Sequence, residues 1–327
     1  MQRRTFLAHA AGVAAALAAG PIMARREKQA LNISLAQWSL NRRFFGKSRE
    51  AGFAEFFRLL MSDPDQLLQG DDPLLFPQIA REEFGIDAVE YVNTFYFSRA
   101  GDEAYLEELA RRAGDAGVAS RLIMCDALGQ LGAAEPAARA AAIENHKPWL
   151  SAAEQLGCHA IRVNVDGEGT REAVADHIVE ALSRLGELAA AHKLSVLVEN
   201  HGGLSSDAGW LADVMSRVGR SNVGTLPDFG NFRLLSNATP RGPDDPFYDR
   251  YQGVAELMPY AHAVSAKSYD FDDAGAETTI DYERMLAIVH ASGYEGDVGI
   301  EYEGNRLSEA DGIRATKALL ERHLSGA

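Results

Sequence analysis

Three acidic residues each end a short apolar run of the sequence. Glu199 ends the run VLVE, Asp228 ends TLPD and Glu301 ends VGIE, while a fourth acid, Glu90, ends AVE. An ionised carboxylate is costly to bury alone, so acids that converge from several buried segments require a cation or hydrogen-bond donors between them. Oxygen ligands favour Mn²⁺, Mg²⁺ or Co²⁺ over a thiolate-bound zinc. We therefore expect a divalent metal ion (Mn, Mg, Co or Zn) as the cofactor.

Such a site can catalyse proton transfer next to a carbonyl group. A metal that binds a substrate carbonyl and the adjacent hydroxyl acts as a Lewis acid, which lowers the barrier to removing the neighbouring C–H proton. A carboxylate then carries that proton. The alternative interpretation is that each acid forms a separate salt bridge, with Arg162, Lys267 or Arg306 as its partner.

The acids lie in a regular pattern of strands and helices. Beyond residue 30, short apolar runs alternate with longer stretches whose apolar residues have helical spacing. The strand candidates are 32–39, 88–92, 120–125, 160–165, 195–199, 223–228, 262–267 and 297–302. The helical candidates are 103–117, 137–156, 171–192, 207–218, 281–292 and 309–324. Eight units of about 36 residues predict an α/β fold, a single (β/α)8 TIM barrel over residues 30–327, with its active site at the carboxyl ends of the strands.

Two longer segments interrupt this regularity. Residues 41–73 and 234–247 are polar and contain several Asp, Asn, Gly and Pro residues. The first is expected to form a short helical excursion over one mouth of the barrel. An open doubly wound sheet is the competing fold, but no Gly-x-Gly-x-x-Gly follows the first strand.

The composition is that of an ordinary globular protein. Of the 327 residues, 46% are hydrophobic and 24% are charged. With 32 basic and 47 acidic residues the formal net charge is −15, which argues against nucleic acid as a partner. Cys125 and Cys158 lie in apolar surroundings, where buried free thiols are expected rather than a disulfide.

The N-terminus has the layout of an export signal. Arg3 and Arg4, in the sequence MQRRTFL, precede an uncharged run of Ala, Gly, Val and Leu that reaches Ala24. This run is too short to anchor the chain in a membrane. Residues 1–24 resemble a twin-arginine signal peptide, which implies a periplasmic protein with no membrane association after cleavage. The alternative is an N-terminal helix of a cytosolic protein.

Three motifs resemble those of a known superfamily. The motifs are VENHGG at residues 198–203, LPDFGN at 226–231 and GIEYEG at 299–304. They are similar to the strand-five, strand-six and strand-eight signatures of the xylose isomerase-like TIM-barrel superfamily, which includes sugar phosphate isomerases and epimerases. The resemblance implies a divalent metal held by Glu, Asp, His and Glu. Glu199, Asp228 and Glu301 match the three acids.

The expected histidine ligand has no clear counterpart. The family typically has His-x-Lys on strand seven, and aligning its lysine with Lys267 puts Ser265 at the ligand position. His262 lies three residues earlier and is expected to face the helices. Two interpretations stay open. Either Ser265, His201 or water completes the metal shell, or the Lys267 ammonium partly replaces the metal.

The resemblance also implies roles in catalysis. In related epimerases the two metal-bound glutamates act as acid and base on opposite faces of the substrate, which assigns these roles to Glu199 and Glu301 here. Lys267 is expected to contact substrate oxygens. The other candidate substrate-binding residues are Trp38, Glu90, Arg162, Asn164 and His201, all close to predicted strand ends. Asn93 and Asp126 are further candidates that would equally suit helix caps.

These expectations combine into a function. An exported protein meets free sugars rather than phosphorylated ones, so we expect a metal-dependent isomerase or epimerase that acts next to a carbonyl of an unphosphorylated carbohydrate. Asn231, where many relatives carry a histidine, also departs from the usual ketose or sugar-phosphate preference. The alternatives are a lyase acting on keto-sugars or 3-keto-glycosides, and a non-catalytic periplasmic carbohydrate-binding protein. The expected partner is a small carbohydrate, and the sequence leaves open whether the chain forms homo-oligomers.

Overall fold

Eight parallel strands form the centre of the molecule. The computed structural model describes residues 31–325, so the predicted signal peptide lies outside the described residues. In the sheet the strands neighbour one another in the order β6-β5-β4-β3-β2-β1-β8-β7. They are β1 (Asn32–Ala36), β2 (Ala88–Val92), β3 (Ala119–Cys125), β4 (Ala160–Val163), β5 (Ser195–Glu199), β6 (Val223–Leu226), β7 (Val264–Ser268) and β8 (Asp297–Tyr302). Each of the eight predicted strands is present, which confirms the predicted (β/α)8 barrel.

The barrel closes where β6 meets β7. Isolated parallel bridges join Thr225 to Ala261 and Asp228 to Ser265. The Ser265 backbone N–H donates to Pro227 O at 3.0 Å, and the Phe229 N–H donates to Ser265 O at 3.1 Å. These contacts place Asp228, the first acid after β6, directly beside Ser265 of β7.

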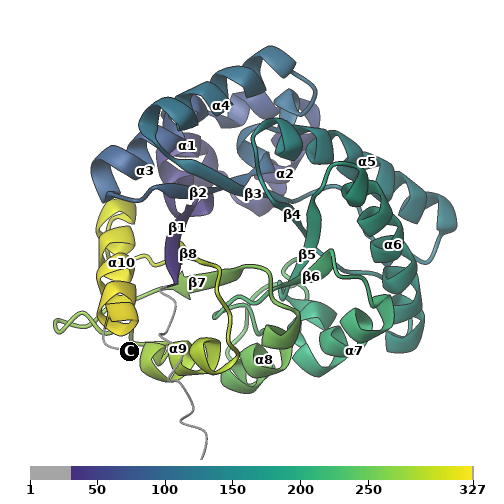
Figure 1. The fold of residues 1–327 in the computed structure, drawn as a ribbon. Helices are drawn as coiled ribbons and strands as arrows, with labels where there is room; N and C mark the ends of the chain where they lie inside the picture. Colours follow the sequence, from purple (N-terminus) through teal and green to yellow (C-terminus); the bar gives the residue numbers. More distant parts are fainter. Residues whose placement is uncertain (1–30, 326–327) are drawn as a thin grey trace, which may run out of the picture.

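Helices surround the strands (Figure 1). They are α1 (Asn41–Phe45), α2 (Phe53–Ser62), α3 (Phe76–Phe84), α4 (Glu103–Ala116), α5 (Pro136–Gln155), α6 (Arg171–Ala191), α7 (Ala208–Val218), α8 (Arg250–Leu257), α9 (Tyr282–Ala291) and α10 (Glu309–Ser325). The six predicted helices correspond to α4, α5, α6, α7, α9 and α10. Two helices, α3 and α8, were not among the six predicted, and in α8 Gly253 interrupts the helical pattern. A Cβ at Gly253 would lie 2.2 Å from the Phe232 ring, so the helix packs there only with glycine.

Several strand ends differ from the prediction. The first strand stops at Ala36 because residues 37–40 wind into a 3-10 turn, in which the Gln37 amide donates to the Tyr96 hydroxyl at 2.9 Å. Strand β6 stops at Leu226, before Pro227, which has no N–H to donate to a ladder. Asp228 therefore lies just beyond the regular strand.

The first interrupting segment is helical, as predicted. It holds α1 and α2, and Phe45 on α1 packs against aromatic residues that follow β1 and β2. The Phe45 and Phe95 rings stack with centroids 4.4 Å apart, and the Trp38 ring meets both of them edge-on at 6.3 and 6.2 Å. The second interrupting segment, 234–247, is irregular.

The core and the cysteines agree with the sequence analysis. Both thiols, Cys125 and Cys158, are buried and free. Over the described residues, no helix combines the length and apolar character needed to cross a membrane.

Candidate active site

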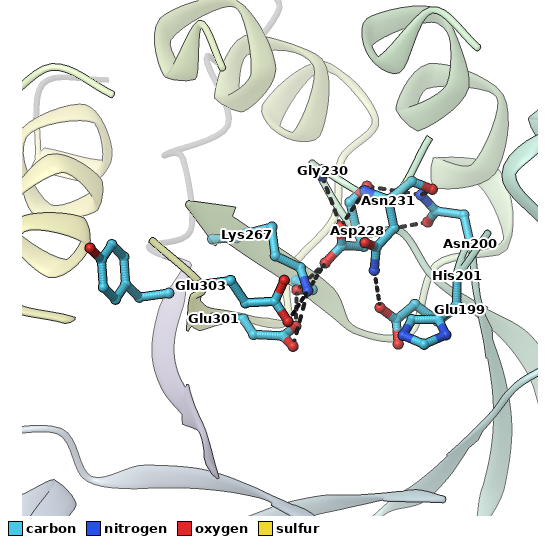
Figure 2. A network of polar contacts seen from close by, with 12 residues as sticks. Glu199, Asn200, His201, Asp228, Gly230, Asn231, Lys267, Glu301 and Glu303 are labelled. Carbon is cyan, nitrogen blue, oxygen red and sulfur yellow. Dashed lines mark hydrogen bonds and ion pairs between the residues drawn. The ribbon is translucent and has the colours of Figure 1, made fainter. Parts of the chain in front are cut away.

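The three predicted acids converge at the carboxyl ends of their strands. Glu199 ends β5, Asp228 follows β6 and Glu301 lies near the end of β8. A carboxylate oxygen from each lies within 4.8 Å of one from each of the others. The three residues are 1%, 0% and 4% exposed, so the cluster is buried (Figure 2). This grouping is the one that the sequence predicted for a metal site.

Backbone amides hold Asp228 in place. Its Oδ1 accepts from the N–H groups of Gly230 at 2.8 Å and Asn231 at 2.7 Å. Asn200, the residue after β5, bridges to the same turn. Its side chain accepts from the Asp228 N–H at 2.8 Å and donates to Asp228 O at 3.0 Å. The segments that follow β5 and β6 are therefore joined by hydrogen bonds between Asn200 and Asp228.

Ser265 lies where the family pattern has its histidine. Its hydroxyl is 2.7 Å from Asp228 Oδ2 and 3.0 Å from Glu301 Oε2. A hydroxyl has one proton to donate, so it can satisfy only one of these two oxygens fully. His262, by contrast, is exposed and precedes β7, away from the cluster.

Lys267 supplies positive charge to the same group. Its Nζ lies 3.0 Å from Glu301 Oε1, 3.7 Å from Asp228 Oδ2 and 3.4 Å from Glu303 Oε1. Burial lowers the pKa of Lys267, but these carboxylates outweigh burial and raise it well above the ordinary value. The ammonium is therefore charged, and Figure 2 shows it directed at Glu301 and Glu303.

Arg162, on β4, is the second buried cation. Its Nε lies 2.7 Å from Glu199 Oε2, and its Nη1 lies 2.7 Å from Asp126 Oδ1. Burial disfavours its charge, but Asp126 and Glu199 raise the pKa of Arg162 above its ordinary value. Asn164 donates to the same Asp126 oxygen at 2.7 Å. These residues form a polar wall beside Glu199.

The arrangement fits a divalent cation. Asn231 Nδ2 donates to Glu199 Oε1 at 2.9 Å, but Glu199 Oε2 has no hydrogen-bond partner, because the Arg162 N–H is not aligned with it. Burial raises the pKa of Asp228 and of Glu301, although Lys267 opposes the shift. When ionised, the acids that face Lys267 and Arg162 outnumber these two cations, since Asp126, Glu199, Asp228, Glu301 and Glu303 all contact them. A divalent ion held by Glu199, Asp228 and Glu301 would remove this excess.

Glu90 lies apart from the three clustered acids. Its Oε1 accepts from the Ser34 hydroxyl at 2.5 Å, and its Oε2 has no hydrogen-bond partner. Burial raises the pKa of Glu90 to about 8. A Cβ at Gly299 would lie 2.5 Å from the Glu90 carboxyl, so the glycine before Ile300 makes room for it. At 1% exposure, Glu90 is an interior residue of the barrel.

The other predicted substrate-binding residues lie at the mouth. Trp38 is half-buried, and its hydrogen bond helps Lys267 and His201 to lower the pKa of Glu303 despite burial. His201 is also half-buried, and the loop after β6 holds it, since Asn237 Nδ2 donates to His201 O at 2.8 Å. Asn93 accepts from the Asp126 N–H at 2.9 Å and so positions that acid.

The sequence analysis assigned no role to Glu303 or Asn200. Glu303 lies two residues after Glu301, so the period-two alternation of a strand could have placed it on the same face. Asn200 has no such signal, because its role depends on the turn after β6. The sequence analysis noted Asn231 only because it replaces a histidine that would contact the substrate. In the structure its side chain donates a hydrogen bond to Glu199.

Comparisons with known proteins agree with this fold. A family model described as xylose isomerase-like TIM barrel matches residues 79–323. Among curated proteins, no sequence matches significantly.

Solved structures with the same fold include sugar-processing and metal-bound proteins. One is 3-keto-D-glucoside 4-epimerase, YcjR, from E. coli (15% identity, 77% of this chain and 95% of that chain covered, TM-score 0.61). Another is the IOLI protein with a bound zinc atom (13% identity, 90% and 99% covered, TM-score 0.62). A third, from Mycobacterium smegmatis, is a xylose isomerase-like TIM barrel protein in complex with magnesium (17% identity, 90% and 97% covered, TM-score 0.61).

Proposed function

Because the chain belongs to the xylose isomerase-like TIM barrel family, we propose that it is a metal-dependent sugar isomerase or epimerase. It removes a proton from the carbon next to a carbonyl of an unphosphorylated carbohydrate. The observation that carries this proposal is the cluster of Glu199, Asp228 and Glu301, three buried carboxylates with oxygens within 4.8 Å of one another. The solved structures that share the fold and hold zinc or magnesium support a metal in this place.

The ligating residues are Glu199, Asp228 and Glu301. A divalent ion bound there would act as a Lewis acid toward the substrate carbonyl. The Ser265 hydroxyl lies within hydrogen-bond distance of Asp228 Oδ2 and Glu301 Oε2 and donates its one proton to one of them. The backbone contacts of Asp228 and the bridge from Asn200 keep the acids close together before any ligand binds.

Glu199 is the base in this proposal. Its Oε2 lies 2.7 Å from Arg162 Nε but accepts no aligned hydrogen bond, whereas Glu301 Oε2 lies 3.0 Å from the Ser265 hydroxyl and Glu301 Oε1 lies 3.0 Å from Lys267 Nζ. Glu301 is the acid that returns a proton to the other face of the substrate. The Lys267 ammonium and the Arg162 guanidinium stabilise negative charge that develops on substrate oxygens, since buried cations act strongly where water is excluded. The Trp38 ring offers an apolar face for sugar C–H groups.

Hydrogen exchange with solvent tests this function. The protein, loaded with Mn²⁺, is incubated in D₂O with a panel of ketoses and 3-keto-glucosides, and deuterium in the recovered sugars is measured by NMR. We expect deuterium at the carbon next to the carbonyl of at least one sugar. Glu199→Gln should abolish this exchange. Glu180→Gln, which changes an exposed acid on α6, should leave it intact.

The products of the same experiment distinguish the alternatives. A product with one inverted stereocentre supports an epimerase, and a product with its carbonyl group moved to the neighbouring carbon supports an isomerase. Release of the aglycone from a 3-keto-glucoside supports the lyase. If neither the ketoses nor the 3-keto-glucosides take up deuterium, the proposed activity is contradicted. Binding without exchange would favour the non-catalytic carbohydrate-binding protein.

We also propose export through the twin-arginine pathway to the periplasm, on the basis of Arg3 and Arg4 and the apolar run after them. Cell fractionation tests this. Replacing both arginines by lysine should retain the full-length chain in the cytoplasm, and an unchanged distribution would contradict export.

A further inference from the structure

A basic hollow opens beside the cluster of acids. It has a volume of about 240 Å³, and its lining includes Asn231 together with the arginines Arg233, Arg241 and Arg250. No Asp or Glu is among the described residues that line it. This contrasts with the chain as a whole, in which 47 acidic residues exceed 32 basic ones. The hollow is therefore a local basic site on an acidic protein.

Asn231 connects the hollow to the acids. It lines the hollow, and its Nδ2 donates to Glu199 Oε1 at 2.9 Å. Gly230, which also lines the hollow, donates its N–H to Asp228 Oδ1 at 2.8 Å. A ligand that reaches Glu199 past Asn231 can thus extend into the hollow.

The guanidinium group of Arg233 is occupied by contacts within the protein. Its Nε lies 2.6 Å from Asp245 Oδ2, and its other nitrogens donate to Ser236 O at 2.8 Å, Thr239 O at 3.0 Å and Pro240 O at 2.9 Å. These contacts fold the irregular segment 234–247 into the rim of the hollow. Its charge is already offset by Asp245.

Arg250 and Arg241 are different. Neither forms an ion pair within 4.0 Å among residues 31–325, although Arg241 is near enough to Asp245 to help lower the pKa of that acid. Arg250 is the first residue of α8, and its Nη1 is buried with no hydrogen-bond partner. A buried donor without an acceptor is costly, and such donors in native proteins call for an explanation. Arg241 is exposed at the rim.

We propose that the hollow binds an anionic group of the substrate, with Arg250 and Arg241 as its partners. The proposal rests on the proposed function, because the sugar ring would lie between the hollow and Glu199. Guanidinium groups bind carboxylates through paired, charge-assisted hydrogen bonds, and because the proposed substrate is unphosphorylated, the anionic group is a carboxylate. Phe247, which is 56% exposed and lines the same hollow, offers an apolar face for the sugar ring. The substrate is an acidic sugar rather than a neutral one.

Calorimetric titration at low ionic strength tests this inference. The panel pairs D-glucuronate and glucose 6-phosphate with neutral D-glucose, and pairs D-gluconate with sorbitol. Inorganic phosphate is included as a free anion. The proteins are the parent chain, Arg250→Gln, Arg241→Gln and the control Arg184→Gln, which changes an exposed arginine on α6.

We expect at least one acidic sugar to bind about tenfold or more tightly than its neutral counterpart. Arg250→Gln should remove this preference, Arg241→Gln should weaken it, and Arg184→Gln should leave it unchanged. Preference for glucuronate or gluconate supports the carboxylate, and preference for glucose 6-phosphate or inorganic phosphate would contradict an unphosphorylated substrate. The inference is overturned if no acidic sugar exceeds its neutral counterpart, or if Arg250→Gln retains the preference.

The two proposals fail separately. Deuterium exchange with neutral sugars that is unaffected by Arg250→Gln would leave the proposed activity intact and overturn the anionic subsite. Binding of acidic sugars that depends on Arg250, without any exchange, would support the subsite and contradict the activity.

Discussion

The Ser265 hydroxyl lies 2.7 Å from Asp228 Oδ2, across the seam where β7 closes the barrel against β6. This contact joins the residue at the position where the family resemblance leads us to expect a histidine to one of the three acids of the proposed metal site. The same hydroxyl reaches Glu301, so one small side chain mediates between two buried carboxylates. Asp228 Oδ2 and Glu301 Oε2 therefore share one hydroxyl proton between them.

Ser265→Ala tests this dependence. Removing the hydroxyl leaves buried carboxylate oxygens without a donor, which costs about 1–3 kcal/mol. We expect the free energy of unfolding to fall by this amount in EDTA, and by less with excess Mn²⁺, because a bound ion would contact the same oxygens. Urea unfolding under both conditions measures the difference. If the free energy of unfolding falls equally with and without Mn²⁺, Ser265 does not contact the same oxygens as the proposed metal ion.

Lys267→Met removes the cation that faces three carboxylates. Breaking a buried ion pair by removing one partner costs about 3–5 kcal/mol, because the remaining charges stay buried. We expect a large loss of stability in EDTA and a stronger stabilisation by Mn²⁺ than in the parent. Lys147→Met, which breaks a more exposed pair with Glu144 on α5, is the control and should change stability little. Equal effects from the two variants would be incompatible with the buried network.

Glu90→Gln should change how stability depends on pH. The folded-state pKa of Glu90 is raised from an ordinary value of 4.5 to about 8 by burial. A carboxyl with a raised pKa holds its proton in the folded state, so its contribution is fully present below pH 4.5 and is lost as pH rises through 8. The glutamine variant should match the parent at about pH 5 and exceed its melting temperature at about pH 9, as measured by thermal unfolding. A variant less stable than the parent at the higher pH would show that Glu90 is needed in its charged form.

Arg233→Met tests the origin of the rim that surrounds the basic hollow. The segment 234–247 has no regular structure, and the Arg233 contacts with Asp245 and three carbonyl oxygens hold it together. We expect amide hydrogen exchange to accelerate across this segment and to stay unchanged in β5. Mass spectrometry of peptic fragments provides the measurement. Unchanged exchange in 234–247 would mean that other contacts define the loop.

The repeating pattern of strands and helices was visible in the sequence because each unit alternates an apolar strand with an amphipathic helix. The acids at strand ends were visible for the same reason, since Glu199, Asp228 and Glu301 each close an apolar run. These features depend on local sequence. They are therefore predictable without knowledge of which segments meet.

Features that depend on contacts between distant segments were not predictable. Asn231 was expected as a lost substrate contact, but the turn after β6 directs it to Glu199. Glu90 was expected to bind substrate near a strand end, and its place beside Ser34 in the interior depends on the absence of a side chain at Gly299. Helix α8 was missed because Gly253 weakens its pattern, while its packing against Phe232 requires that glycine. In each case the partner lies far away in the sequence.

The metal content of the purified protein tests the central claim most directly. Elemental analysis should find close to one equivalent of Mn, Co, Mg or Zn in the parent. The double variant Glu199→Gln, Glu301→Gln should lose the metal, while Glu180→Gln, an exposed change on α6, should retain it. Circular dichroism on the same samples establishes that each is folded. A folded parent that holds no divalent metal, even after incubation with each ion, would contradict the proposed site and leave Lys267 as the principal cation of the cluster.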